Sequence, residues 1–374
     1  MQAYEFVVIG AGIAGASAAY QLAKLGSTVI FERESQPGYH TTGRSAAVFS
    51  EIYGNATIRG LTVGSRQFFA SPPTGFCEYP LWKQRRSMMI ARSDQLAKLK
   101  CAYNAWVKLV PSVRWLEGDE ARDVAPMLKR DYVAGGVLEP SANDLDVHEI
   151  HRGFLRGAAR AGATLVCDAE VLDLSRQGAA WRVRTKSGEF RGDFIVNAAG
   201  AWGDTVAVLA GARPVGLAPK RRTAILFDPA PSKDVNSWPI IIDADEQFYF
   251  KPETGRVLGS PADETVSPPC DAQPEEIDVA LAVDRIERAA TFRAQRLVRK
   301  WAGLRNFVTD KSPVVGLDQQ IPGFFWLVAQ GGDGIQTSPA LGRVAAALIG
   351  GGDVPEDLQR LGVQAANLSP ARLH

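Results

Sequence analysis

Three glycines near the N-terminus have the spacing of a nucleotide-binding turn. Gly10, Gly12 and Gly15 come directly after the apolar run 4–9, and Glu32 ends the next apolar run. In such a unit the first glycine permits a tight turn, the second lets the backbone approach a pyrophosphate, and the third allows close packing of the helix on the strands. A carboxylate at the position of Glu32 can accept hydrogen bonds from ribose hydroxyls. The pattern therefore predicts a dinucleotide with a free 2′-hydroxyl, either FAD or NAD.

Strand-to-glycine junctions recur at three later places in the chain. The Gly-Arg-Ser turn at 43–45 offers backbone amides, a hydroxyl and a guanidinium to phosphate oxygens. The apolar run 194–196 leads to Gly200, and the run 324–329 leads to the glycine-rich loop 331–334. Distant segments that meet one extended ligand favour FAD over NAD.

Two arginines and a tyrosine have the chemistry to bind a small anion. Arg305 stands among apolar residues, where a buried cation needs a partner. Arg222 ends a basic run at 220–222 that could equally be a solvated surface, and Tyr249 lies in an alternating run that could equally belong to a core. The residues by themselves do not decide whether Arg222 binds an anion or is solvated, or whether Tyr249 binds an anion or belongs to a core.

Elements that could position these residues can be read from local patterns. Asp146, with Glu149 three residues later, predicts a helix start, and we expect strands at about 164–167 and 190–197. The run 240–252 alternates like an antiparallel strand. A further helix is expected from about 338 to 349, with Pro339 in its first turn.

Composition excludes several classes of protein. The chain has 374 residues, 46% of them hydrophobic, which is typical of a globular protein with one large unit or two domains. With 42 Lys and Arg against 41 Asp and Glu, the formal charge is +1, so a nucleic-acid partner is not expected. The 36 glycines are an excess over the usual share of about 7%.

Neither a metal site nor a membrane span is expected. The four cysteines, at 77, 101, 167 and 270, are too scattered for a zinc site or a disulfide framework, and His148 and His151 read as solvated residues of one helix face. No run is long and apolar enough to cross a membrane, and no signal peptide is expected at the N-terminus. We therefore expect the cytoplasm, with peripheral attachment to the inner membrane if a quinone takes the electrons.

Taken together, these motifs resemble one known family. The unit 10–32, the turn 43–45, Asn-Ala-Ala-Gly at 197–200, Trp-Ala-Gly-Leu-Arg at 301–305 and Gly-Gly-Asp-Gly at 331–334 look like the D-amino-acid oxidase superfamily. Within it, the chain is most similar to the catabolic D-arginine dehydrogenases of bacteria, over essentially its whole length. Shared runs include QPGYHTTGRSAA, NAAGAW and PKRR.

The resemblance implies an α/β fold with a discontinuous, Rossmann-like FAD-binding domain and an inserted α+β substrate domain that carries an antiparallel sheet. We place the FAD-binding domain at 1–82, 144–218 and 309–374, and the substrate-binding domain at 83–143 and 219–308.

FAD is expected to be bound without a covalent link, because no cysteine lies near Arg305 or the loop 331–334. The expected contacts come from all the glycine junctions and from residues beside them. They are Gly10, Gly12, Ile13, Ala14, Gly15, Glu32, Arg33, His40, Thr42, Gly43, Arg44, Ser45, Ala46, Ala47, Val171, Ala199, Gly200, Trp202, Gly303, Gly331, Gly332, Gly334, Ile335, Gln336 and Thr337.

The reaction that the resemblance implies is hydride transfer from the α-carbon of a D-amino acid to flavin N5, followed by hydrolysis of the imino acid to a 2-oxo acid and ammonia. Arg222 and Arg305 would bind the α-carboxylate, Tyr53 and Tyr249 would add hydroxyl contacts, and the Gly332 carbonyl would receive the amine. The electron acceptor, oxygen or a quinone, stays open.

Three departures bear on the substrate. The relatives that act on D-arginine carry a histidine, a glutamate and a tyrosine where this chain has Val48, Ser87 and Asp333. The missing glutamate would remove a charge-assisted bond to a guanidinium, worth about 1.5–3 kcal/mol. Asp333 either replaces that partner or caps the following helix. We therefore expect a D-arginine-like or a broadened specificity.

Two alternatives remain. The first is a flavin oxidase of glycine or of N-substituted amino acids, including sarcosine and opine-type amines, which would use the same carboxylate-binding residues. The second is a dinucleotide-binding protein without catalysis, which the side chains at 222, 249 and 305 argue against.

Overall fold

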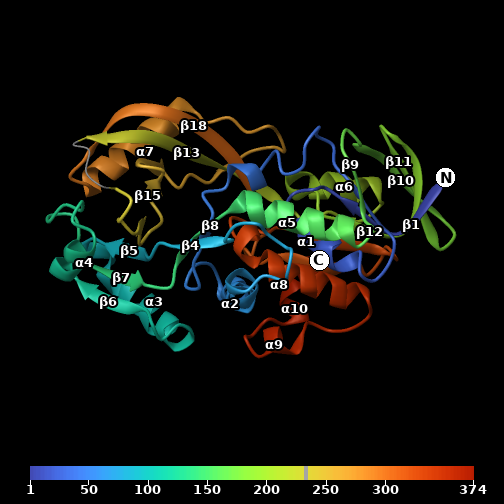
Figure 1. The fold of residues 1–374 in the computed structure, drawn as a ribbon, viewed down its shortest axis with the longest axis horizontal. Coiled ribbons are helices and arrows are strands. Elements are labelled where there is room, and N and C mark those ends of the chain that lie inside the picture. Colours follow the sequence, from blue (N-terminus) through green and yellow to red (C-terminus); the bar gives the residue numbers. More distant parts are fainter. Residues whose placement is uncertain (231–234) are drawn as a thin grey trace.

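The computed structural model describes residues 1–230 and 235–374. Two large β-sheets lie at opposite ends of the molecule in Figure 1, the one with β1 on the right and the one with β15 on the left. Long strands and a small sheet run between the two ends, so the architecture is α/β with a second, largely antiparallel sheet.

The eight-stranded sheet has a parallel centre. Strand β1 (Gln2–Ile9) pairs in parallel with β2 (Thr28–Phe31) and with β12 (Gly188–Asn197), and β12 also pairs in parallel with β20 (Phe324–Val328). The other strands are β9 (Thr164–Val166), β10 (Val171–Gln177), β11 (Ala180–Thr185) and β19 (Val314–Leu317). The expected strands near 164–167 and 190–197 are confirmed.

Three helices pack together beside this sheet. Helix α1 (Ile13–Leu22) contacts both α5 (Val147–Arg160) and α8 (Gly334–Ile349). The α1–α8 contact is close because Gly342 has no side chain: a Cβ there would lie 2.6 Å from the Ser17 carbonyl oxygen. The short helix α6 (Gly203–Leu209) contacts β10 and β12 instead.

The nine-stranded sheet contains one long antiparallel pair of strands that are distant in the sequence. Strand β13 (Ala218–Ala230) pairs antiparallel along its length with β18 (Arg293–Phe307). Strands β14 (Ile240–Asp243) and β15 (Tyr249–Glu253) form an antiparallel pair within the run 240–252 that was expected to be antiparallel strand. The other members are β5 (Ser87–Ala91), β6 (Arg114–Glu117), β7 (Gly135–Glu139), β16 (Arg256–Ser260) and β17 (Thr265–Val266).

A three-stranded sheet of β3 (Val48–Phe49), β8 (Asn143–Leu145) and β4 (Trp82–Gln84) lies where the chain passes between the large sheets. We propose that the domains divide near this sheet, at the boundaries expected from the sequence. The remaining helices are α2 (Ala56–Ala70), α3 (Leu96–Leu109), α4 (Gly118–Val124), α7 (Glu276–Ala289), α9 (Glu356–Gln359) and α10 (Ala365–Leu368).

Two local expectations were wrong. Helix α8 begins at Gly334, four residues before the expected start, so Pro339 lies inside the helix and not in its first turn. His148 is exposed as expected, but His151 is buried, and its Nε2 lies 2.8 Å from the Ala11 carbonyl oxygen. The histidine therefore supports the glycine turn after β1.

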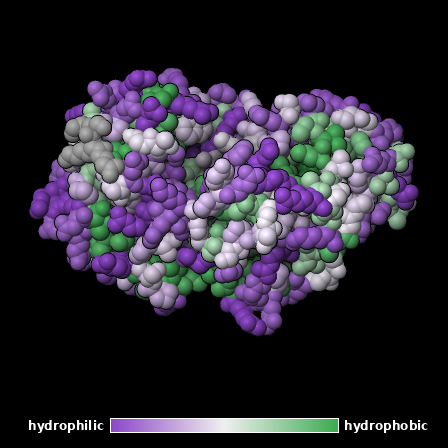
Figure 2. Space-filling view, in the orientation of Figure 1, coloured by the Kyte–Doolittle hydropathy of each residue, from purple (hydrophilic) through white to green (hydrophobic). Residues whose placement is uncertain are grey.

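Hydrophilic residues cover much of the face seen in Figure 2, and apolar residues gather there in separate areas. Among the helices of the described residues, none combines the length and the apolar character that a membrane crossing requires.

Candidate cofactor and substrate site

The glycine junctions meet at one edge of the eight-stranded sheet. Strands β1, β12 and β20 run parallel, so the loops after them lie side by side at the carboxyl ends. These loops and the segment 38–45 line a cleft with a volume of about 1310 Å³, including the solvent space at its mouth. The sheet thus brings together segments that are far apart in the sequence.

Most of the expected cofactor contacts line this cleft. They are Gly10, Gly12, Ile13, Ala14, Glu32, Arg33, His40, Thr42, Ser45, Val171, Ala199, Gly200, Trp202, Gly331, Gly332, Gly334 and Ile335. The others are not among the residues that line the cleft: Gly15, Gly43, Arg44, Ala46, Ala47, Gly303, Gln336 and Thr337.

The turn after β1 requires its glycines for two different reasons. Gly10 has φ +100°, and a Cβ there would lie 2.5 Å from the Ala198 carbonyl oxygen. Gly15 packs directly on the Gly10 carbonyl, so a side chain would separate α1 from the strand. The backbone can therefore come close to a ligand at Gly10 and Gly12, while Gly15 serves packing.

Glu32 is buried and its carboxylate is held in place. It accepts hydrogen bonds from the Ala11 amide at 2.8 Å and from the Glu34 amide at 3.0 Å. Because it lines the cleft beside the glycine turn, it can accept further bonds from a ribose.

Arg44 was expected to offer its guanidinium to phosphate oxygens, but the structure pairs this group with other protein residues. Its guanidinium donates to the carbonyl oxygens of Ala272 at 2.9 Å and Ala302 at 3.0 Å, and it forms an ion pair with Asp271. The Trp301 Nε1 in turn donates to the Arg44 carbonyl at 3.0 Å. Arg44 thus fastens the 43–45 turn to β18, and phosphate contacts from this turn are left to Ser45 and the backbone.

The cleft fits an FAD molecule. Besides the glycine turns, it is lined by His40 and Asn306, whose buried Nδ1 and Oδ1 atoms have no hydrogen-bond partner among the described residues. Unpaired buried polar atoms are costly unless a ligand or water satisfies them. A nucleotide on the Gly10 turn and an isoalloxazine ring near Gly331 and Gly332 would meet both needs.

A second group of residues lies beside the Gly331–Gly334 loop. Gly332 abuts Arg305, because a Cβ at Gly332 would lie 2.6 Å from the guanidinium carbon. Burial lowers the pKa of Arg305, but Tyr53, Tyr249 and Asp333 outweigh burial and keep that pKa above its ordinary value. Burial raises the pKa of Tyr53 to about 12, so its hydroxyl stays protonated.

Arg222 comes from the neighbouring strand and is buried. Its Nε donates to the Asp263 carbonyl at 2.9 Å, and a terminal nitrogen lies 3.4 Å from the Glu264 carboxylate. Burial and the nearby Arg305 both lower its pKa. The solvated-surface alternative for Arg222 is therefore wrong, and two guanidinium groups lie close enough to repel each other.

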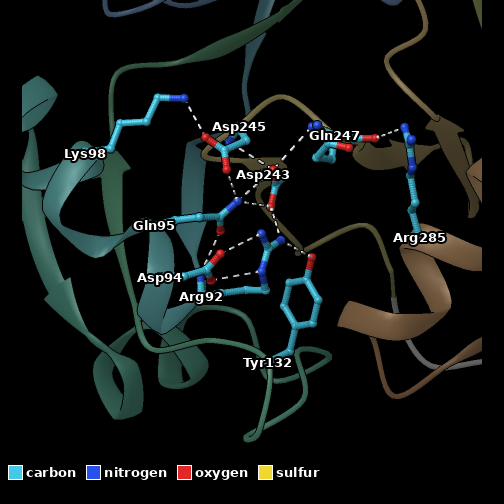
Figure 3. A network of polar contacts seen from close by, with 9 residues as sticks. All are labelled: Arg92, Asp94, Gln95, Lys98, Tyr132, Asp243, Asp245, Gln247 and Arg285. Atoms are coloured by element: carbon cyan, nitrogen blue, oxygen red, sulfur yellow. Dashed lines mark hydrogen bonds and ion pairs between the residues drawn. The ribbon is translucent and has the colours of Figure 1, made fainter.

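The turn that leads into Tyr249 is held by a polar network (Figure 3). The buried Asp243 carboxylate accepts from Gln95 at 3.2 Å and from the backbone amides of Asp245 and Gln247 at 2.9 and 3.2 Å. Lys98 and Gln95 also donate to Asp245. This fixes Glu246, at φ +54°, whose carboxylate lies 3.3 Å from the Tyr53 hydroxyl.

Two buried carboxylates, Asp333 and Glu139, lie near this group, and only Asp333 was considered in the sequence analysis. Asp333 precedes α8, but its side chain forms no capping bond, so the cap interpretation is wrong. Glu139 lies opposite Ser87 in the β5–β7 pair and accepts bonds from the Ser50 hydroxyl and the Glu51 amide. Burial raises the pKa of Glu139 to about 7. No local motif marks Glu139.

Comparison with known proteins identifies the class. A family model described as FAD dependent oxidoreductase matches residues 5–348. The chain therefore belongs to the FAD dependent oxidoreductase family, and its cofactor is FAD.

Two distant relatives match more than nine-tenths of the chain. The glycine oxidase of Geobacillus kaustophilus (strain HTA426) is 23% identical over 92% of this chain and 93% of its own length. The uncharacterized oxidoreductase YurR of Bacillus subtilis (strain 168) is 24% identical over 95% of this chain and 97% of its own.

Among solved structures, L-proline dehydrogenase from P. horikoshii superposes with a TM-score of 0.84 at 21% identity, covering 99% of this chain and 98% of that one. Glycine oxidase from Geobacillus kaustophilus gives a TM-score of 0.82 at 20% identity, covering 98% and 99%. At this identity the superpositions establish the fold. The family match supports the superfamily part of the resemblance, whereas the relatives found do not support the D-arginine branch.

Proposed function

We propose that the chain oxidises α-amino carboxylates, with D-amino acids as the first substrate class. The observation that supports this is a group of two buried arginines, Arg222 and Arg305, that interact electrostatically with Tyr53 and Tyr249 beside the cleft that fits FAD. Guanidinium groups suit a carboxylate because their donors match its two oxygens. The substrate would thus be oriented by its carboxylate.

When bound, the flavin accepts the α-hydrogen with its electron pair. The chain must hold the substrate so that the α-carbon faces the ring, and it must keep the amine neutral at that moment. Arg305 and Arg222 would fix the carboxylate, and the Gly332 carbonyl would accept a hydrogen bond from the amine. Water then hydrolyses the imino product to a 2-oxo acid and ammonia.

D-Arginine itself is a test case for this proposal. Ser87 is buried and lacks the carboxylate that would bind a guanidinium, and Val48 offers no hydrogen bond. We propose a broadened specificity in which apolar and basic D-amino acids react with similar kcat/KM values. A preference for D-arginine of about a hundredfold or more would contradict it, since one charge-assisted bond is worth that much.

A second candidate is the oxidation of glycine or of N-substituted amino acids. It is favoured by the names of relatives, which include glycine oxidase and, at 22% identity over 96% of this chain and 44% of its own length, the human mitochondrial dimethylglycine dehydrogenase. These substrates carry the same carboxylate, so the two arginines serve both candidates.

Anaerobic mixing of the FAD-loaded protein with a panel of amines tests the proposal. We expect D-amino acids to bleach the visible flavin absorbance, whereas L-amino acids do not. Bleaching by glycine or sarcosine alone supports the second candidate, and a yellow protein that no amine bleaches contradicts both. Readmission of oxygen then separates an oxidase, which regains its colour at once, from a dehydrogenase that needs a quinone.

A further inference from the structure

Asp333 occupies the position of a helix cap without acting as one. Its backbone is fixed on both sides, because its amide donates to the Gln330 carbonyl at 2.9 Å and its carbonyl accepts from the Thr337 amide at 3.1 Å. Its side chain makes no capping bond and is buried, with 8% of the residue exposed. A buried carboxylate that accepts no hydrogen bond from the backbone amides of the helix needs another explanation.

The carboxylate is oriented from one side only. Gln336 Nε2 donates to Asp333 Oδ1 at 2.9 Å, and the Ser50 amide fixes Gln336 by donating to its Oε1 at 3.0 Å. Within residues 1–230 and 235–374, no donor to the second carboxylate oxygen is found. One oxygen is thus anchored and the other is available to a ligand.

The charges around Asp333 come from four elements. Arg305 on β18 and Arg222 on β13 favour its ionised form, whereas Glu246 on the β14–β15 turn opposes it. Tyr53, in the segment before α2, belongs to the same electrostatic group. Burial dominates and raises the pKa of Asp333 to about 6, so the group is largely ionised at neutral pH and can still take up a proton.

Resting on the proposed function, we propose that Asp333 accepts the proton of the substrate's α-ammonium group. The preceding residue, Gly332, lies against the Arg305 guanidinium, and the Asp333 carboxylate interacts electrostatically with Arg305. An amino acid whose carboxylate is bound by Arg305 would therefore lie beside the loop that carries Asp333. The N–H bond breaks, its electrons stay on nitrogen as a lone pair, and an O–H bond forms on Asp333. The lone pair then forms the C=N bond as the α-hydrogen leaves with its electron pair for the flavin.

Two ligands of the same shape test this assignment by binding alone. 2-Aminoisobutyrate carries the ammonium but has no α-hydrogen to lose, and 2,2-dimethylpropanoate has a methyl group in place of the ammonium. Perturbation of the flavin spectrum in the FAD-loaded protein gives their dissociation constants. We expect Asp333→Asn at pH 8 to weaken 2-aminoisobutyrate about tenfold or more, and to leave 2,2-dimethylpropanoate unchanged or bound more tightly.

The pH dependence adds a second readout. For the wild-type protein, 2-aminoisobutyrate should bind more weakly as the pH falls through about 6, and this dependence should vanish in Asp333→Asn and persist in Asp333→Glu. Asp357→Asn is the matched control, because Asp357, on α9, forms an ion pair at the surface with Arg343 of α8. It should behave as the wild type.

Other outcomes overturn the assignment. The assignment is wrong if Asp333→Asn binds each ligand as tightly as the wild type does. If Asp333→Asn loses affinity for both ligands in parallel, Asp333 only positions Arg305. A loss confined to basic amino acids would make it the partner of a side chain. If wild type binds neither ligand and no amine bleaches it, the proposed function itself has failed.

Discussion

The flavin cleft and the substrate group use different parts of the polypeptide. The cleft is lined in part by backbone, at turns where Gly10 and Gly331 hold positive φ angles. The substrate group consists of side chains, with Arg222 and Arg305 on paired strands and Asp333 on the loop before α8. A site lined by backbone depends on glycines, which have no side chain. A site built from side chains depends on residues that distant strands bring together.

This difference predicts that the two sites fail separately. Substitutions in the glycine turns should release FAD and, with it, all activity. Substitutions in the substrate group should leave a yellow, folded protein that has lost the reaction. Each variant below tests one side of that separation.

The largest effect is expected for Gly10→Ala. The new Cβ would meet the Ala198 carbonyl at 2.5 Å, in a φ that L residues rarely adopt, so we expect purified protein without FAD and with a markedly lower melting temperature. The ratio of visible to ultraviolet absorbance measures this. Gly351→Ala is the control, since it has φ +78° but nothing within 4 Å of its Cβ. If both variants keep FAD equally, close approach at Gly10 is not required.

Arg305→Met should lower kcat/KM about a thousandfold while FAD content stays at the wild-type level. Methionine keeps much of the apolar stem but loses the paired donors to the carboxylate, each worth about 1.5–3 kcal/mol. Steady-state kinetics at matched FAD content provide the measurement, with Arg343→Met on the surface of α8 as control. A variant that loses FAD as well would show that the two sites are coupled.

Glu139 predicts a pH dependence of stability. The folded protein holds this proton more tightly than the unfolded chain, with a pKa raised from 4.5 to about 7, so the free energy of unfolding should fall as the pH rises through that range. The fall should be roughly 3 kcal/mol. Urea unfolding at several pH values should show it in wild type and not in Glu139→Gln. The same slope in both proteins would assign it to another group.

The smallest effect is expected for Asp243→Asn. Losing a charge from the network in Figure 3 should loosen the turn that carries Glu246 and leads into Tyr249. We expect KM to rise about two- to fivefold with kcat little changed, because the asparagine side-chain oxygen can still accept most of these hydrogen bonds. Lys108→Met, on the exposed end of α3, should change neither constant.

The sequence predicted the backbone site better than the side-chain site for a physical reason. The Gly10–Glu32 unit is local, so its strand, turn and helix follow from adjacent residues, as they do in the structure. Arg222 looked like part of a solvated run because burial along β13 depends on its pairing with the distant strand β18 and not on the local sequence. Arg44 looked like a phosphate ligand because its partners lie more than two hundred residues away.

His151 and Asp333 illustrate the same limit. The helix that carries His151 was expected from Asp146, but only the packing of α5 against the glycine turn shows that its imidazole is buried there. For Asp333, a carboxylate that caps the helix and one that is buried beside other charged groups have the same local sequence, and the bond from Gln336 distinguishes them.

The most direct test of the account is anaerobic flavin reduction in wild type and Arg305→Met at equal FAD content. With a D-amino acid that bleaches the wild type, the account predicts rapid loss of the visible absorbance in the wild type and persistent yellow colour in the variant. Bleaching of Arg305→Met at the wild-type rate would contradict it, because the side chains beside the Gly331–Gly334 loop would then not be what holds the substrate.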